Sequence, residues 1–281
     1  MKKFSEQKSN LEVVAKATDP KASRRLKTEC KRNGPPDEYG VVDLKKTNWE
    51  KQIIRRGIKI FQRIIKDLGM DIKFCPNLKY FHIISKKEMR RKLQEKNPTN
   101  GYFNCHAYLL RDHSPWYFVH GLFHELAHFV SYYKLQITLG DNGQLQYRRL
   151  INGFADNQNP RLDFNGFDEA VTEMLAIKAR QLFASSKLLS ANQKKALLTN
   201  IGYHLHVAFV EELLMQKTNN QEELMALKNK VFKAYILGQR EQLFKKLRLD
   251  ANTIAALKKM TTAKTATHRA IAFLGWPVII V

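Results

Sequence analysis

A histidine pair inside an apolar run constrains this chain more than any other feature of its sequence. The motif His-Glu-x-x-His runs from His124 to His128, and the residues around it, from Phe118 to Val130, are mostly apolar. This pattern predicts a buried helix, and Ser114-Pro115 just before it supplies an N-cap followed by proline at the first helical position. On a helix, residues four apart share one face. Both imidazoles could therefore hold one metal ion, with Glu125 beside it to polarise a water molecule.

The motif alone is a moderate signal, because a chain of this composition contains it by chance roughly once in a hundred sequences. A zinc site on such a helix also needs a third protein ligand, and the downstream residues disfavour two common arrangements. Ser131 and Lys134 stand where one class has glycine and histidine, and Leu135 stands where another class has histidine. A carboxylate from a second helix remains as the expected third ligand.

That carboxylate is expected between Asn165 and Ala176, a segment that contains Asp-Glu-Ala-Val-Thr-Glu from Asp168 to Glu173. With the upstream motif, this segment resembles the gluzincin metallopeptidases, whose second motif reads approximately Asn-Glu-Ala-x-(Ser/Thr)-(Asp/Glu). The resemblance implies that Glu169 is the third zinc ligand and that Glu173, one turn later, orients a ligand histidine. The sequence departs from the family where Asp168 replaces the common asparagine. It also departs in spacing, because Glu169 lies 41 positions after His128, more than in compact members. The alternative reading is an acidic pair on a solvated helix face.

The resemblance and the hydrophobic pattern together predict an α+β fold of the zincin type. A small mixed sheet would pack on the motif helix, and a mainly helical C-terminal part would follow. We expect residues 1–45 to form a basic, disordered arm, residues 46–184 the zincin-like catalytic domain, and residues 185–281 a helical subdomain that completes the cleft. A two-residue alternation from Tyr102 to Leu110 predicts a strand. By resemblance to zinc peptidases, this would be the edge strand against which an extended peptide substrate pairs.

Helical patterns occupy much of the remainder. Thr47 to Glu50 has capping-box spacing and opens an amphipathic helix that runs to Gly69, and Ser85 opens another helix with the same spacing. The helix that contains Glu169 is expected to end near Phe183. Further downstream, a strand or hairpin arm is expected over Gln144–Ile151 and helices over Leu197–Leu213, Glu222–Leu237, Gln239–Leu247 and Asn252–Met260.

The C-terminal helices also offer a donor for the oxyanion of a hydrolytic reaction. The pattern from Tyr203 through Phe232 to Phe244 is similar to the helical ends of uncharacterised bacterial peptidases of the gluzincin type. Such ends often supply a tyrosine or histidine that hydrogen-bonds the oxyanion, and Tyr203 is the candidate here, with His204 and His206 as alternatives. A tyrosine that satisfies a backbone carbonyl explains Tyr203 about as well.

Other histidines near the motif are interpreted as structural. Cys105 and His106 face opposite sides of the strand expected there, which argues against shared metal ligation. His120 extends the histidine stripe by one turn, but a partly buried helix histidine with a local hydrogen bond is the simpler interpretation.

The charge balance favours anionic partners. Lysine and arginine exceed aspartate and glutamate by 48 − 26 = 22, which promotes binding to nucleic acid or to an anionic surface through an electrostatic term independent of sequence. A lysine-rich proteome that spreads its charge evenly would give the same total. The helix after Thr47 carries Arg55, Arg56 and Lys59 on its outer face, where they could contact phosphates, although a solvated face is the ordinary interpretation.

Cysteine usage and hydropathy bear on localisation. Cys30, Cys75 and Cys105 are scattered and form no C-x-x-C motif, which favours a reducing compartment without disulfides. The N-terminal residues lack the apolar run of a signal peptide, and no apolar stretch is long enough to span a membrane. We therefore expect a soluble, cytoplasmic protein. Secretion by a route that needs no cleavable signal is the alternative.

Together these patterns predict a zinc-dependent peptidase that acts on a peptide or protein substrate. Zn²⁺ held by His124, His128 and Glu169 would bind water, Glu125 would remove its proton, and Tyr203 or a histidine would stabilise the oxyanion. Glu125 would then return the proton to the leaving amine. The alternative is a nucleic-acid-associated protein, either a DNA-linked protease or a basic binding protein without catalytic activity.

Overall fold

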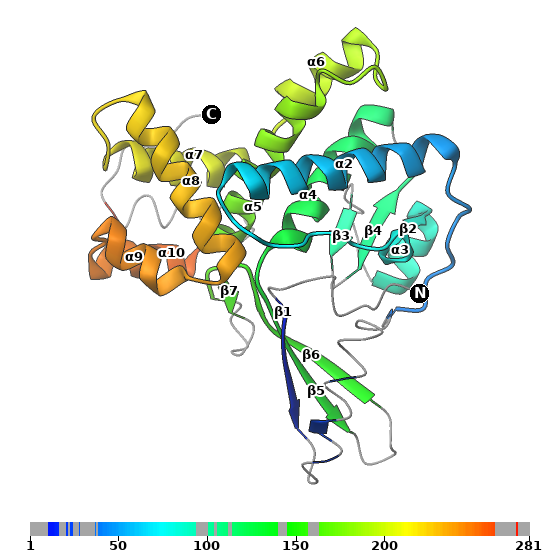
Figure 1. Ribbon diagram of the computed structural model, residues 1–281, viewed down its shortest axis with the longest axis horizontal. Coiled ribbons are helices and arrows are strands. Elements are labelled where there is room, and N and C mark those ends of the chain that lie inside the picture. Colours follow the sequence, from blue (N-terminus) through cyan, green and yellow to red (C-terminus); the bar gives the residue numbers. More distant parts are fainter. Residues whose placement is uncertain are drawn as a thin grey trace. The chain divides into compact units, whose positions relative to one another are not determined.

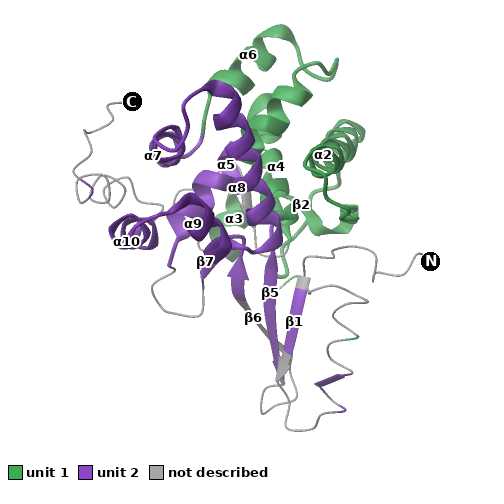
Figure 2. Ribbon diagram, turned by 60° about the vertical axis from the view of Figure 1, so that its left-hand side comes forward, with its two compact units in different colours: residues 1–9, 28–130, 175–201 green, residues 10–27, 131–174, 202–281 purple. Residues whose placement is uncertain are grey.

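The computed structural model divides into two compact units, which Figure 2 colours separately. Unit 1 comprises residues 1–9, 28–130 and 175–201, and unit 2 comprises residues 10–27, 131–174 and 202–281. The structure describes residues 11–16, 37, 39–93, 101–103, 106–111, 114–139, 145–156 and 163–261, together with positions 21, 23, 24, 28 and 274. These residues form nine α-helices and two small mixed sheets, so the α+β class is confirmed.

The sheet of unit 1 has three strands in the order β2-β4-β3, namely β2 (Phe81–Ile84), β4 (Ala107–Leu110) and β3 (Gly101–Phe103). Strands β2 and β4 are parallel, whereas β3 and β4 are antiparallel. The single strand expected from Tyr102 to Leu110 is therefore wrong, because the segment contains two antiparallel strands. Of these two, only β3 lies at the sheet edge, as expected, whereas β4 is the central strand. Both arms of a hairpin alternate with the same two-residue period, so the alternation does not reveal where the chain reverses.

The helices of unit 1 are α2 (Asn48–Asp67), α3 (Lys86–Leu93), α4 (Pro115–Val130), α6 (Ala191–Thr199) and the second half of α5 (Asn165–Phe183) (Figure 1). The capping box predicted at Thr47 is present, and α2 ends at Asp67, just before Gly69. Helix α2 crosses α4 at Gly57, where an added Cβ would lie 2.6 Å from Leu126 Cδ1. Only glycine therefore allows this close approach without a shift of the leucine.

The three-stranded sheet packs on α4, as expected. The ring of Phe81 in β2 lies 5.2 Å from the ring of Phe129 in α4. All residues of β2 and β4 are buried, which explains why both strands are almost continuously apolar. The segment from Ile72 to Phe74 has no regular secondary structure, and a short 3₁₀ helix (Leu78–Tyr80) leads into β2.

Unit 2 contains a four-stranded sheet in the order β1-β5-β6-β7, with bounds Leu11–Lys16, Tyr133–Leu139, Leu145–Asn152 and Ala155–Asp156. Strand β6 agrees with the strand expected over Gln144–Ile151. Strand β1 lies in the arm expected to be disordered, so that expectation is wrong for Leu11–Lys16. Its backbone pairs in parallel with β5, and Glu12 accepts a hydrogen bond from Tyr132 Oη and pairs with Lys134 at 3.0 Å.

The C-terminal helices of unit 2 are α7 (His204–Met215), α8 (Gln221–Leu237), α9 (Arg240–Leu247) and α10 (Ala251–Lys259). The last three agree with the expected ranges. The long helix expected over Leu197–Leu213 is wrong, because α6 ends at Thr199 and α7 starts at His204. The chain is extended at Asn200 and left-handed at Tyr203, whose φ is 50°. Asn200 Nδ2 also donates to the carbonyl of Ala196 (2.7 Å), which competes with continuation of the helix.

Helix α5 (Asn165–Phe183) ends where the sequence predicts and contributes residues to both units. The two units are divided after residues 9, 27, 130, 174 and 201, whereas the sequence suggested boundaries after residues 45 and 184. Within the described residues, no helix combines the length and the apolar character needed to cross a membrane.

Candidate metal centre

Helix α4 holds both motif histidines in a buried environment. The carbonyl of Ser114 accepts the N–H of Phe118 (3.1 Å) at the start of the helix. Every residue from Phe118 to Val130 is buried, so the buried helix predicted from the motif is confirmed. The ring of Phe123 packs on Phe183 of α5 at 5.3 Å, which fixes the second half of α5 against α4. Such close packing restricts the rotamers available to neighbouring side chains.

The two histidines and Glu169 come together as the sequence predicts. His124 and His128 have ring centroids 5.0 Å apart and ring planes at 78°. One ring nitrogen from each histidine and one carboxylate oxygen of Glu169 all lie within 4.8 Å of one another. This group could hold a metal ion, and in the described part of the chain it is the one group of three or more His, Cys, Asp or Glu side chains with that geometry. Glu125, which follows His124 on α4, is 4% exposed.

The chemistry of these donors suits a catalytic metal. Two imidazoles and one carboxylate form a three-ligand set that leaves one position of a tetrahedral ion open to water or substrate. Metal–ligand bonds of about 2.0–2.2 Å at tetrahedral angles place the ligand atoms roughly 3.4 Å apart. Donor atoms within 4.8 Å of one another therefore need only a small rotation of their side chains to reach this separation. His124, His128 and Glu169 would hold the ion.

Buried hydrogen bonds fix the start of α5, where Glu169 lies. Asp168 accepts the backbone N–H of Phe154 at 2.7 Å, and the hydroxyls of Thr172 and Tyr235 are 2.6 Å apart. Burial raises the pKa of Tyr235 well above its ordinary value, and the charges of Asp168 and Glu169 raise it further, so the phenol stays neutral. The sequence assigned no role to Thr172 or Tyr235, although Thr172 occupies the Ser/Thr position of the second motif.

Glu173, predicted to orient a ligand histidine, is fully buried and accepts the N–H of Gly202 at 3.0 Å. Its contact with a ligand imidazole stays a prediction. The hydrogen bond to Gly202 ties the turn before α7 to α5, one helical turn beyond Glu169. Tyr203, the predicted oxyanion donor, follows Gly202 directly and is half-buried. The residue before Tyr203 is thus hydrogen-bonded to the helix that bears Glu169, while the role of Tyr203 in a reaction stays a prediction.

The alternative histidines have separate positions. Nε2 of His206 bonds the carbonyl of Thr261 at 2.8 Å, and the residue is 2% exposed, so His206 links α7 to the segment after α10. His204 is half-buried at the start of α7. His120 is buried on α4 and stacks on Tyr117 with ring centroids 6.5 Å apart, consistent with a structural histidine.

A second histidine pair lies in unit 1, around the sheet. Nε2 of His82 lies 2.7 Å from Nδ1 of His106, and Nδ1 of His82 lies 3.1 Å from Asp43 Oδ1. The two rings are nearly parallel at 16°, and His82 also stacks on Tyr108. The structural role predicted for His106 is confirmed by these contacts. Cys105 lies outside the described residues.

No family model matches the chain, and neither does any curated protein or solved structure. The interpretation of the centre therefore depends on its own residues and their geometry.

Proposed function

We propose that this protein is a zinc-dependent peptidase of the gluzincin type. The single observation that supports the proposal most is the convergence of His124, His128 and Glu169 within 4.8 Å, with Glu125 beside the first histidine. In the sequence these residues belong to two separate motifs. A His-Glu-x-x-His motif that occurred by chance would not be expected to lie next to the second motif in space. Three ligands rather than four favour catalysis over a purely structural metal.

The chain's own residues have distinct tasks in this proposal. Glu125 accepts the proton of the attacking water and passes it to the leaving amine, and its burial strengthens these charge interactions. A zinc ion in such a centre supplies Lewis-acid polarisation and makes water a stronger nucleophile. Tyr203 donates a hydrogen bond to the oxygen of the substrate carbonyl as negative charge develops there. Asp168, Thr172 and Glu173 keep α5 in position.

Metal content and peptide hydrolysis test the proposal together. The full chain is purified, washed with a mild chelator, measured by elemental analysis, and assayed on a mixture of quenched fluorescent peptides. We expect about one zinc per chain in the wild type. Glu169→Ala should retain much less zinc, whereas Glu222→Ala, which removes an exposed carboxylate from α8, should retain it fully.

Glu125→Gln separates metal binding from catalysis. This variant keeps the size of the side chain but cannot accept a proton, so zinc should stay bound while hydrolysis falls by roughly a hundredfold or more. Undiminished hydrolysis in Glu125→Gln would refute the assigned base. Wild-type protein that takes up no zinc even after reconstitution would refute the metal centre, and equal zinc in Glu169→Ala would move the third ligand elsewhere.

A further inference from the structure

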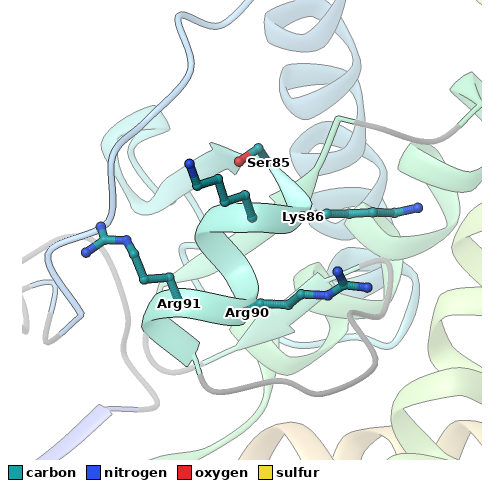
Figure 3. A pocket seen from close by; sticks show the side chains of 5 residues that line it. Ser85, Lys86, Arg90 and Arg91 are labelled. Carbon is teal, nitrogen blue, oxygen red and sulfur yellow. The ribbon is translucent and has the colours of Figure 1, made fainter.

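Helix α3 in unit 1 borders a shallow groove that the proposed peptidase centre does not use. The groove has a volume of about 660 Å³ and is lined by Ser85, Lys86, Lys87, Arg90 and Arg91. Figure 3 shows Lys86 and Arg90 extending to the same side of the helix, with Arg91 on the opposite side. All of these lining residues are polar, and four of the five are basic.

The basic residues of α3 are held on a fixed framework. Met89 is fully buried in a cluster with Ile84, Tyr108 and Leu110 of the sheet. Glu88, the one acidic residue between positions 86 and 93, accepts the backbone N–H of Val42 (2.9 Å) and pairs with Arg91 at 2.7 Å. The hydrogen bonds of Arg91 hold the pKa of the Glu88 carboxyl below its ordinary value, so it stays ionised. The single acidic residue therefore neutralises only a small part of the positive charge of the helix, which carries five basic residues.

This arrangement of charge works against the stability of the helix itself. Lys86 and Lys87 occupy the first turn, where the helix dipole disfavours cations. Lys86 with Arg90, and Lys87 with Arg91, are like-charge pairs four residues apart, which also disfavour a helix. A helix that keeps this charge in spite of its local cost is a candidate for binding an anion.

Charge is also concentrated in this part of the chain. Residues 39–93 contain 15 lysines and arginines but only 5 aspartates and glutamates, a net charge of +10 out of +22 for the whole chain. This stretch is about a fifth of the chain and carries almost half of its net charge. An even spread over the surface, the ordinary explanation for a basic protein, therefore does not describe this distribution.

The types of residue that line the groove favour one class of anionic partner over the others. An acidic peptide would need an apolar anchor in a pocket for stable docking, and an anionic membrane would need bulky apolar side chains to insert. The groove residues offer neither, since Met89 is buried in the core. Among the described residues that line the groove there is also no aromatic side chain that could stack on bases. Phosphates of a nucleic-acid backbone need only cations and hydroxyl donors.

We propose that the α3 groove binds the sugar–phosphate backbone of a nucleic-acid strand without regard to base sequence. Lys86, Lys87 and Arg90 contact the phosphates, and the hydroxyl of Ser85, whose oxygen already accepts the N–H of Glu88 (3.2 Å), donates to the same strand. The inference does not depend on the metal centre. Loss of zinc by a ligand variant such as Glu169→Ala leaves this binding unchanged.

Fluorescence anisotropy on the full chain tests the inference. The probes are labelled single strands and duplexes of about 20 nucleotides in two unrelated sequences, titrated between about 50 and 200 mM salt. The test variant is Lys86→Gln/Lys87→Gln. Its matched control is Lys245→Gln/Lys246→Gln, which removes an adjacent lysine pair from the exposed face of α9. Both variants lose the same net charge.

The test variant should bind roughly tenfold more weakly and should lower the slope of log affinity against log salt by about 2. The matched control should stay within about twofold of the wild type, and both base sequences should bind equally. The unfolding temperature of the test variant should be equal to or slightly above that of the wild type, because cations in the first turn disfavour the helix.

Three results would overturn the inference. Equal losses in the two variants would show that only total charge matters. A wild-type protein that binds no strand at about 50 mM salt would exclude the groove as a nucleic-acid site. Tighter binding to poly-glutamate or to phosphatidylserine vesicles than to either strand would assign the groove to a different partner.

Discussion

Two pairs of buried histidines in unit 1 share residue type and burial but use their ring nitrogens differently. His82 and His106 are 7% and 5% exposed, and His124 and His128 are 9% and 5% exposed. In the first pair the facing nitrogens lie 2.7 Å apart and Asp43 accepts at the other end of His82. In the second pair the rings are tilted at 78°, and one nitrogen of each gathers with Glu169.

The backbone explains the difference. His82 lies on β2 and His106 just before β4, and adjacent strands bring side chains close enough to stack in parallel, here at 16°. His82 uses both of its ring nitrogens, one on His106 and one on Asp43, and so has none left for a metal ion. His124 and His128 instead lie one helical turn apart, and their ring centroids are 5.0 Å apart. This spacing leaves room for a metal ion between one nitrogen of each ring. Histidine pairs with similar burial can therefore form either an internal hydrogen bond or part of a group that could hold a metal ion.

The largest effect expected from this comparison is on metal binding. His124→Ala should lose most of its zinc and reduce peptide hydrolysis by roughly a thousandfold or more, because a lost ligand removes several kcal/mol of stabilisation from the reaction. His106→Ala should keep its zinc. Elemental analysis and the peptide assay measure both variants, and a chelator should lower the unfolding temperature of the wild type and of His106→Ala but not of His124→Ala. Loss of zinc in both His124→Ala and His106→Ala would contradict the proposal that only the His124/His128 pair binds the metal.

A medium effect is expected on stability. His82→Phe or His106→Phe leaves the partner ring nitrogen buried without its hydrogen bond, which should cost about 1–3 kcal/mol of unfolding free energy. The double variant should cost less than the sum, with a coupling of about 0.5–3 kcal/mol in urea unfolding. His82→Phe combined with His206→Phe, which lies in the other unit, should be additive. If the effects of His82→Phe and His106→Phe were themselves additive, the contact between the two rings would contribute nothing to the unfolding free energy.

The smallest effect concerns Asp37, which belongs to the same network as His82. Burial opposes its ionisation, but hydrogen bonds from Tyr108 Oη and the Tyr39 N–H outweigh burial and lower the pKa of Asp37 below its ordinary value. A lowered pKa in the folded chain means that ionised Asp37 stabilises the fold above about pH 4. This contribution is lost as the pH falls through the folded-state pKa.

Asp37→Asn should therefore lower the unfolding free energy by up to about 1 kcal/mol at neutral pH, and the difference from wild type should shrink below about pH 4. Urea unfolding over a pH series measures it. The exposed Asp71→Asn variant serves as the control and should change stability little. A difference between Asp37→Asn and wild type that persists unchanged at acid pH would show that ionisation of Asp37 is not its cause.

Elements with strong local signals could be predicted from the sequence. The capping box at Thr47 starts α2 where expected, the apolar run after Ser114-Pro115 forms α4, and α8 to α10 lie within one or two residues of their expected ranges. Each of these signals acts between residues a few positions apart, through caps and helical periodicity. The spacing of the two motifs also predicted which residues share a helix face, and the resemblance to the gluzincins proposed Glu169 as the third ligand.

Elements that depend on distant pairing could not be predicted. Strand β1 forms because its backbone pairs with β5, more than a hundred residues later. The reversal between β3 and β4 leaves the alternation unchanged, and the break before Tyr203 follows from local hydrogen bonding at Asn200 rather than from a loss of apolar periodicity. Hydrophobic period alone does not distinguish one strand from a hairpin or one helix from two.

By itself, the sequence determined which side chains can share a helix face: His124 with His128, and Glu169 with Glu173. It also determined the excess of positive charge. Only the tertiary structure decided that Glu169 joins the histidines while Glu173 bonds Gly202, and that Lys86, Lys87 and Arg90 line one groove. The physical reason is that helical periodicity determines neighbours within one turn, whereas the choice between two carboxylates on the same face depends on packing among residues far apart in the chain.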